Sequence, residues 1–204
     1  MTASGKPVML RSDRLILRPW RDSDLPAMAR MNADPRVMEF MPTVLDRPAS
    51  DAMVTRLQRH IDEKGFGFWA VEAPGVADFI GFVGLSRPSF AAPFMPCVEI
   101  GWRLQHDFWG RGYATEAARA ALRHGFIDLG LAETVSFTAA VNRRSRRVMQ
   151  RLGMQHYRAE DFDHPALPAG DPLQRHVLYR LDRDHWLRRE AAETAGARRA
   201  ESSG

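Results

Sequence analysis

The stretch DFWGRGYATEA at residues 107–117 has residue types and a spacing that suit an anion. Gly110 and Gly112 carry no Cβ, so a bulky anion can approach the backbone there without a steric clash. The residues that follow predict a helix, whose first N–H groups have no acceptor within the helix and lie at the positive end of its dipole. This combination predicts a phosphate site formed by the N–H groups of residues 110–115.

Two common nucleotide motifs fit this stretch poorly. A dinucleotide fingerprint requires G-x-G-x-x-G after the first strand, but here the third glycine is missing and the stretch lies in the middle of the chain. A P-loop requires G-K-[ST] after four spacer residues, which the stretch also lacks. A nucleotide-binding protein therefore stays only a third interpretation.

The strands and helices that must hold this site follow from hydrophobic periodicity. Strands are predicted at residues 14–20, 66–73, 78–86, 97–104, 133–141 and 176–181, with PGVA as a hairpin turn after residue 73. Helices are predicted at residues 22–32, 50–64, 114–130 and 143–153, with N-caps at Ser23 and Ser50 and a stop at Gly65. The order indicates one mixed α/β domain over residues 1–187. Residues 188–204 show no periodicity and are expected to form a flexible tail.

Composition and charge limit the classes of partner. The 204 residues are 45% hydrophobic and 26% charged, as in a globular protein with one core. The net charge of +4 suits an anionic small molecule, whereas the interspersed acids disfavour nucleic acid. Cys97 is the only cysteine, which excludes an intrachain disulfide. No apolar run approaches the roughly 20 residues of a membrane span, so we expect a cytoplasmic protein with no membrane partner.

Two motifs, in this order, resemble those of the GNAT family of acetyl-CoA-dependent N-acetyltransferases. The pyrophosphate loop of that family reads [QR]-x-x-G-x-[GA], and residues 109–114 read W-G-R-G-Y-A, with Trp109 at the first position. Asn142 and Ser145, followed by LGM at 152–154, are similar to the family's N-x-x-[AS] helix start and its LGF or LGM. Tryptophan at position 109 resembles the branch that acetylates ribosomal-protein N-termini. The resemblance covers roughly residues 10–182.

The resemblance implies the GNAT fold, a mixed and mostly antiparallel sheet of six to seven strands with helices on both faces. A V-shaped splay between two central strands leaves one edge unpaired, and the pantetheine arm of acetyl-CoA would pair with it. Acetyl-CoA is the implied cosubstrate, and no metal is implied. The implied cofactor-binding residues are Trp102, Arg103, Leu104, Trp109, Gly110, Arg111, Gly112, Tyr113, Ala114, Thr115, Asn142, Ser145 and Arg147.

Glu99 and Ser145 are the expected catalytic residues. An alkyl amine has a pKa near ~10 and an α-amine near ~8, so a base or a desolvated site must take up a proton. Glu99 is the first choice for this base and Glu72 the second; alternatively, Glu99 is a surface or ion-paired strand residue. Many family members carry a tyrosine acid where this chain has Met149, so Ser145 is expected to assist the leaving thiolate. The alternative for Ser145 is a local helix cap with Asn142.

A proline-interrupted stretch at 156–176 is expected to form a loop over the acceptor pocket. Trp69, Phe90, His164 and His176 are expected to line that pocket, and the histidine spacing matches no metal-ligand pattern. The implied reaction is transfer of an acetyl group to a primary amine, on a protein N-terminus or a small molecule, by direct attack in a ternary complex. The alternative is a non-catalytic acyl-CoA-binding or sensor protein with the same fold. A homodimer is left open.

Overall fold

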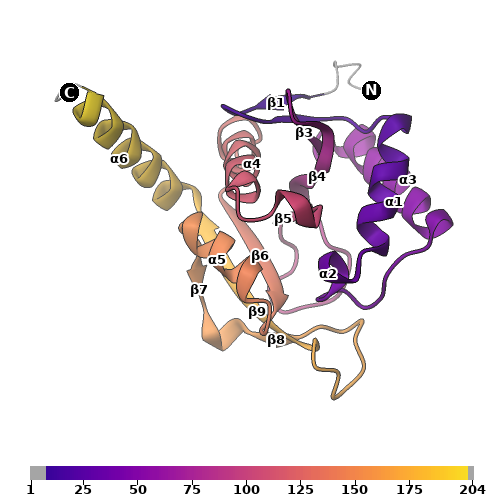
Figure 1. Ribbon diagram of the computed structural model, residues 1–204. Helices are drawn as coiled ribbons and strands as arrows, with labels where there is room; N and C mark the ends of the chain where they lie inside the picture. The colour runs from indigo at the N-terminus through magenta and orange to yellow at the C-terminus, as the bar shows by residue number, and fades with distance from the viewer. Residues whose placement is uncertain (1–7, 202–204) are drawn as a thin grey trace.

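One nine-stranded sheet forms the centre of the molecule in the computed structural model, which describes the backbone of residues 8–201 (Figure 1). The strand order is β1-β2-β3-β4-β5-β6-β9-β7, and β8 also pairs with β9. The strands are β1 (Leu10–Arg11), β2 (Ile16–Arg18), β3 (Phe68–Ala73), β4 (Ala77–Ser86), β5 (Glu99–Leu104), β6 (Glu133–Ala139), β7 (Gln155–His156), β8 (Phe162–Asp163) and β9 (Arg175–Asp182). The predicted mixed, mostly antiparallel sheet is confirmed. It has more strands than predicted because β1, β7 and β8 are too short to show a period in the sequence.

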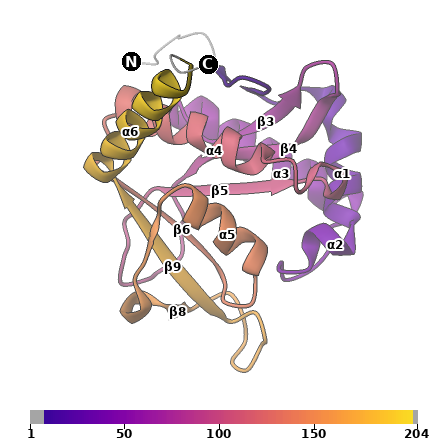
Figure 2. The same ribbon diagram turned by 60° about the vertical axis from the view of Figure 1, so that its left-hand side comes forward.

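The predicted splay lies between β5 and β6, the one parallel pair among the described strands. The two strands are joined only at Glu99 and Val135, and the Val135 N–H donates to the Val98 carbonyl at 2.9 Å. Beyond that point β5 and β6 run apart, as Figure 2 shows. Residues 100–104 therefore pair with β4 and have no strand partner on the other side among residues 8–201.

The hydrogen-bonding pattern of β5 determines which of its backbone N–H and C=O groups face this opening. The Val98 carbonyl accepts from β6, and the Gln105 N–H donates to Ile80 at the end of the β4 ladder at 2.9 Å. Backbone groups alternate between the two sides of a strand. Even-numbered residues from 98 to 104 therefore face β6, and odd-numbered residues face β4. The peptide groups of Trp102 and Leu104 thus lie at the opening.

Helices cover both faces of the sheet, as predicted (Figures 1 and 2). The helices are α1 (Leu25–Ala33), α2 (Pro35–Met38), α3 (Arg47–Lys64), α4 (Tyr113–Arg123), α5 (Arg143–Arg151) and α6 (Arg183–Glu201). Met28 and Met31 of α1 pack with Phe82 on one face. Ala117 and Leu122 of α4 belong to a core that includes Ile100. Glu99 lies on the opposite face of β5 from Ile100, because side chains alternate along a strand.

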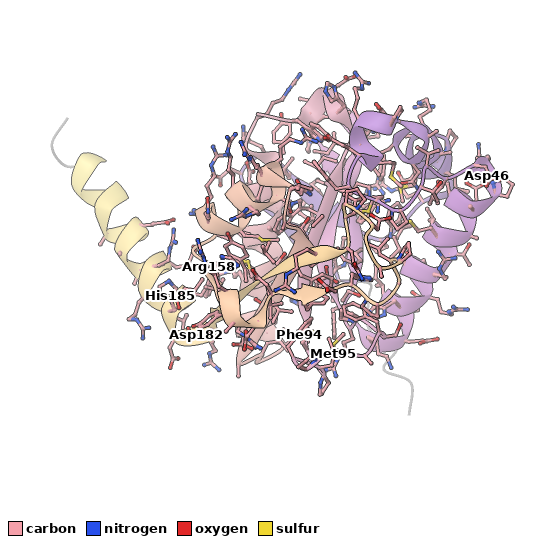
Figure 3. All side chains as sticks on the ribbon, turned by 90° about the horizontal axis from the view of Figure 1, so that it is seen from below. Asp46, Phe94, Met95, Arg158, Asp182 and His185 are labelled. Atoms are coloured by element: carbon pink, nitrogen blue, oxygen red, sulfur yellow. The ribbon has the colours of Figure 1, made fainter. Side chains whose placement is uncertain are left out.

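The cap of α3 differs from the prediction. The Asp46 carboxylate accepts a hydrogen bond from the Ala49 N–H at 2.8 Å, so the helix begins at Arg47. Ser50 is buried inside the helix, where its hydroxyl accepts from the Asn32 side chain at 2.9 Å. The predicted cap at Ser50 is therefore wrong. Figure 3 places Asp46 at the outer margin of the molecule. Gly65 ends the helix with a φ of 76°, as predicted.

The first helix also begins later than predicted. Ser23 lies within a 3-10 turn at Asp22–Asp24 and does not cap α1, which begins at Leu25. The predicted helix 114–130 also differs from the structure near its C-terminal end, where α4 passes into a π-helical segment, η3 (His124–Asp128).

Helix α6 leaves the sheet after β9 and extends away from it (Figure 1). Trp186 is buried against Phe126, with ring centroids 5.4 Å apart. The helix continues over residues 188–201, for which no regular structure was expected, whereas 1–7 and 202–204 lie outside the described residues. The domain boundary at 187 stays a prediction. Within residues 8–201, no helix combines the length and the apolar character needed to cross a membrane.

Candidate active site

The loop before α4 presents unpaired backbone donors. Gly110 and Gly112 have φ angles of 75° and 82°, in the left-handed region that favours glycine. The first helical bond runs from the Glu116 N–H to the Gly112 carbonyl at 3.0 Å. Within the described part of the chain, the N–H groups of residues 110–115 donate to no acceptor. Free donors at the positive end of a helix suit a phosphate group.

Arg14 lies beside this loop and was not expected from the sequence. Its guanidinium donates to the Arg111 carbonyl at 3.2 Å, pairs with Glu116 at 2.6 Å and lies 4.8 Å from the centre of the Tyr113 ring. The side chain of Arg14 is 52% exposed, so it adds accessible positive charge. No sequence signal identifies the contact, because 97 positions separate the two segments.

A cleft of about 620 Å³ opens beside the first turn of α4. It is lined by Arg11, Ser12, Asp13, Gly112, Thr115, Glu116, Arg119, Ala120, Arg123, Arg151 and Glu190. The cleft thus brings Gly112 and Thr115 next to four arginines and three carboxylates.

Trp109 connects the loop to the open edge of β5. Its indole N–H donates to the Leu104 carbonyl at 2.9 Å, so this carbonyl already has a partner. The Trp102 peptide group and the Leu104 N–H remain for a ligand at the opening. Arg103, which was expected to contact the cofactor through its backbone, has its peptide groups directed to β4 instead.

The start of α5 has both of the expected side chains, with different roles. Asn142 accepts from the Ser145 N–H at 3.1 Å and donates to Thr138 at 2.9 Å, so the local helix cap of Asn142 and Ser145, which was the alternative for Ser145, is present. The Ser145 hydroxyl has no hydrogen-bond partner among residues 8–201. It is half-buried and can still donate to a ligand.

Arg144, which was not expected at the site, joins α5 to the opposite side of the opening. Its guanidinium lies 4.7 Å from the centre of the Trp109 ring and 5.2 Å from that of Phe40, and it pairs with Glu39. Arg147 is exposed and makes no ion pair within the described residues. These contacts link α5, which follows β6, to the loop that follows β5 and to the segment that follows α2.

Glu99 lies where β5 and β6 separate. Its side chain has no hydrogen bond or ion pair among the described residues, and burial raises the pKa of its carboxyl to about 8. This excludes the alternative of an ion-paired residue. Glu72, the second choice for a base, instead pairs with Arg18 at 2.8 Å and Arg21 at 3.2 Å. An unpaired carboxyl that titrates near neutral pH is suited to proton transfer.

The burial of Glu99 predicts a pH-dependent stability. The folded protein holds the Glu99 proton more tightly than the unfolded chain, because burial raises the pKa from 4.5 to about 8. Folding is therefore penalised as pH rises from about 4.5 to about 8, with no penalty below and the full penalty above. We expect Glu99→Gln to melt at the wild-type temperature near about pH 4 and at a higher temperature near about pH 9. A melting-temperature difference that is constant with pH contradicts this.

Three of the four expected acceptor residues come together in an aromatic cluster. The cluster consists of Phe90, Phe94, Phe137, Phe162, His164 and His176. The ring of Phe90 lies 4.7 Å from that of His164, which in turn lies 4.9 Å from that of His176. Val135 pairs with Glu99, so the two side chains lie on the same face of the sheet. Phe137 is two positions after Val135 and therefore lies on this face as well. Figure 3 shows Phe94 beside Met95 at the lower margin of the molecule.

The aromatic cluster forms an apolar surface. Burial lowers the pKa of both His164 and His176, which keeps the two imidazoles neutral at neutral pH. No group of three or more His, Cys, Asp or Glu side chains suitable for a metal occurs in the described part of the chain. The cluster therefore suits an apolar or aromatic part of a ligand.

Trp69, the fourth expected acceptor residue, lies elsewhere. It is fully buried in the core on the α4 side, with its ring 5.7 Å from that of His124. It is on the face opposite to Glu99 and offers no surface to a ligand. The expectation for Trp69 is therefore wrong. Phe137 was missed, although the alternation within the predicted strand 133–141 carries a signal for it.

Comparisons with known proteins agree with this geometry. Residues 14–155 match the family model described as acetyltransferase (GNAT) domain. Over 201 residues the chain is 30% identical to FsC-acetyl coenzyme A-N(2)-transacetylase of Aspergillus fumigatus, covering 92% of this chain and 81% of that protein.

Solved structures share the fold. A GNAT-family acetyltransferase from Bacillus anthracis aligns with a TM-score of 0.72 at 23% identity, over 87% of this chain and 99% of that one. Spermidine N-acetyltransferase from Vibrio cholerae, solved with CoA and spermine, aligns with a TM-score of 0.68 at 18% identity, over 86% and 99%. At these identities the alignments show a common fold only.

Proposed function

The chain belongs to the acetyltransferase (GNAT) domain family, and from this premise we propose that Glu99 acts as the base for direct acetyl transfer from acetyl-CoA to a primary amine. The observation that carries this proposal is an unpaired, half-buried carboxyl at the point where β5 and β6 separate. Family membership supplies acetyl-CoA-dependent N-acetylation. The position of Glu99 supports its specific role.

The donor side is assigned from the free backbone groups. The N–H groups of residues 110–115 would hold the diphosphate of acetyl-CoA, with Arg14 adding positive charge. The peptide group of Trp102 and the Leu104 N–H would pair with the amide groups of the pantetheine arm, as an added strand does. An N–H at this edge would also stabilise the oxyanion, a contribution worth about 3–4 kcal/mol when preorganised.

Glu99 and Ser145 supply the groups that acetyl transfer requires. The amine nitrogen attacks the thioester carbonyl carbon, a C–N bond forms, and the C–S bond breaks. The proton that the amine loses passes to the Glu99 carboxylate, directly or through one water. The Ser145 hydroxyl donates a hydrogen bond to the departing sulfur.

The aromatic cluster supports an acceptor with an apolar part next to its amine. The peptide N-terminus suggested by Trp109, including that of a ribosomal protein, is one such acceptor. A small-molecule amine is the other, and the name of the Aspergillus relative, an N(2)-transacetylase, favours acetylation of nitrogen. Homodimer formation, absence of nucleic-acid binding and cytoplasmic location stay predictions.

A panel of primary amines tests the proposal. The protein is incubated with acetyl-CoA and, separately, with short peptides, aromatic amines and diamines, and both CoA release and the mass of the product are measured. We expect CoA release that depends on an amine and yields a product with one added acetyl group. Thermal stabilisation by acetyl-CoA without amine-dependent release would instead indicate a non-catalytic binding protein.

Replacing Ser145 has a small expected effect. The Ser145→Ala variant should lower kcat about 3- to 10-fold, since a hydrogen bond from a neutral hydroxyl is worth about 1 kcal/mol. Its stability should not change, because the cap uses the backbone N–H of this residue and the side chain of Asn142. In the matched variant Asn142→Ala, urea unfolding should show a loss of about 1 kcal/mol. An unchanged kcat in Ser145→Ala removes Ser145 from the mechanism.

A further inference from the structure

Arg103 is a second ionisable side chain without an ion-pair partner among the described residues, on the same face of β5 as Glu99. Its guanidinium donates to Asn32 at 2.9 Å and to the sulfur of Met41 at 3.0 Å, and it lies 5.3 Å from the centre of the Phe82 ring. No carboxylate pairs with Arg103 among the residues that the structure describes. Burial lowers the pKa of Arg103 to about 10, so it stays a cation at neutral pH.

Arg18 shows how this chain satisfies a buried arginine that has a structural role. Its guanidinium donates two hydrogen bonds to Asp24 at 2.8 Å, one to Glu72 at 2.8 Å and one to the Asp78 carbonyl at 2.6 Å. Buried charges normally require such partners, because removal from water is costly. Arg103 has one amide oxygen and weak sulfur acceptors in their place. Unlike Arg18, Arg103 is only half-buried, so a ligand can reach the guanidinium donors that these acceptors leave free.

The spacing on β5 determines how far apart two ligand groups must lie. Glu99 and Arg103 are four residues apart on the same face, which corresponds to about 13 Å of strand. A ligand that bridges these two positions needs its amine and its second group on the order of 10 Å apart. An extended tripeptide has about this length, at about 3.3–3.6 Å per residue. A single α-amino acid is too short.

Resting on the proposed function, we infer that the acceptor carries a carboxylate about 10 Å from its reactive amine, and that Arg103 binds this carboxylate. The amine would lie at Glu99 and the anion between β5 and the α1–α3 layer. The same guanidinium repels a second cation, so polyamines are poor acceptors. The acceptor class is therefore a short acidic amine, with a tripeptide as the simplest probe.

Matched substrates test this inference. A tripeptide with a free C-terminal carboxylate, its C-terminal amide and spermine are compared in steady-state kinetics with acetyl-CoA. For the wild type we expect kcat/KM to be about 10- to 100-fold higher for the acid than for the amide, mainly through KM, with spermine no better than the amide. Arg103→Met should lose this preference, whereas Arg103→Lys should retain part of it. The control Arg56→Met removes an exposed charge from α3 and should keep the preference.

The outcomes separate the inference from the function on which it rests. Equal kcat/KM for acid and amide in the wild type, or an equal loss for both substrates in Arg103→Met, overturns the role of Arg103. Acetylation of none of the amines overturns the proposed function instead. CoA affinity measured by calorimetry confirms that each variant is folded, and the wild-type comparison stands even if Arg103→Met does not fold.

Discussion

Glu99→Gln should lower kcat/KM about 10²- to 10⁴-fold while leaving the Kd for CoA unchanged. The carboxamide has nearly the same shape as the carboxyl but cannot take up the proton of the attacking amine. Since the neutral form of Glu99 dominates below its pKa of about 8, wild-type kcat/KM should rise with pH up to this value and then level off. The rise should be absent in Glu99→Gln.

An aromatic amine is the acceptor of choice for this measurement, because it stays uncharged across the range and adds no titration of its own. Glu63→Gln is the matched control, since Glu63 is an exposed carboxylate on α3. The control should keep the wild-type rate and pH profile. A Glu99→Gln variant with wild-type kcat/KM shows that the amine reacts without this base.

Valine at position 110 should weaken CoA binding at least about 100-fold. A β-branched residue cannot readily adopt the left-handed conformation of Gly110, whose φ is 75°, so the loop must change its path. A new path redirects the N–H groups that we propose hold the diphosphate, and losing two or more charge-assisted hydrogen bonds of about 1.5–3 kcal/mol each accounts for the loss. Isothermal titration calorimetry with CoA measures this change in Kd.

Gly75 offers a matched control for this substitution. It has a φ of 74° in the β3–β4 turn, and a Cβ added at Gly75 or at Gly110 meets nothing within 4 Å. Gly75→Val should therefore cost a similar amount of stability, about 1–3 kcal/mol, and bind CoA as the wild type does. Equal CoA affinity in Gly110→Val and Gly75→Val rules out the loop as the diphosphate site.

Local motifs were predictable because their chemistry lies within a few consecutive residues. The left-handed glycines before α4 and the Asn142 cap each depend on neighbours in the sequence. The cap of α3 was misjudged, since both Asp46 and Ser50 can cap a helix and only packing shows that Ser50 bonds Asn32.

Residues that meet across long sequence distances were predicted less well. Trp69 was expected at the site because aromatic rings often line pockets, but the face of β3 on which it lies is set by pairing with β4. The absence of a counter-ion at Arg103 is equally invisible in the sequence, because acids are frequent throughout the chain and the fold alone decides which of them reach it. Sequence patterns identify elements and loops, whereas burial and charge pairing depend on the assembled sheet.

The break between β5 and β6 also bears on self-association. An unpaired strand edge at the rim of a sheet invites a strand from another molecule and promotes aggregation. Here the longest unpaired backbone lies inside the sheet, while the rim strands β1 and β7 have two residues each. A polypeptide that enters the break would have to fit its side chains between the flanking helices. A slender linear molecule has no side chains and enters without this steric problem. The interior position of the break thus limits fibre growth and domain swapping while keeping a strand-like binding surface open.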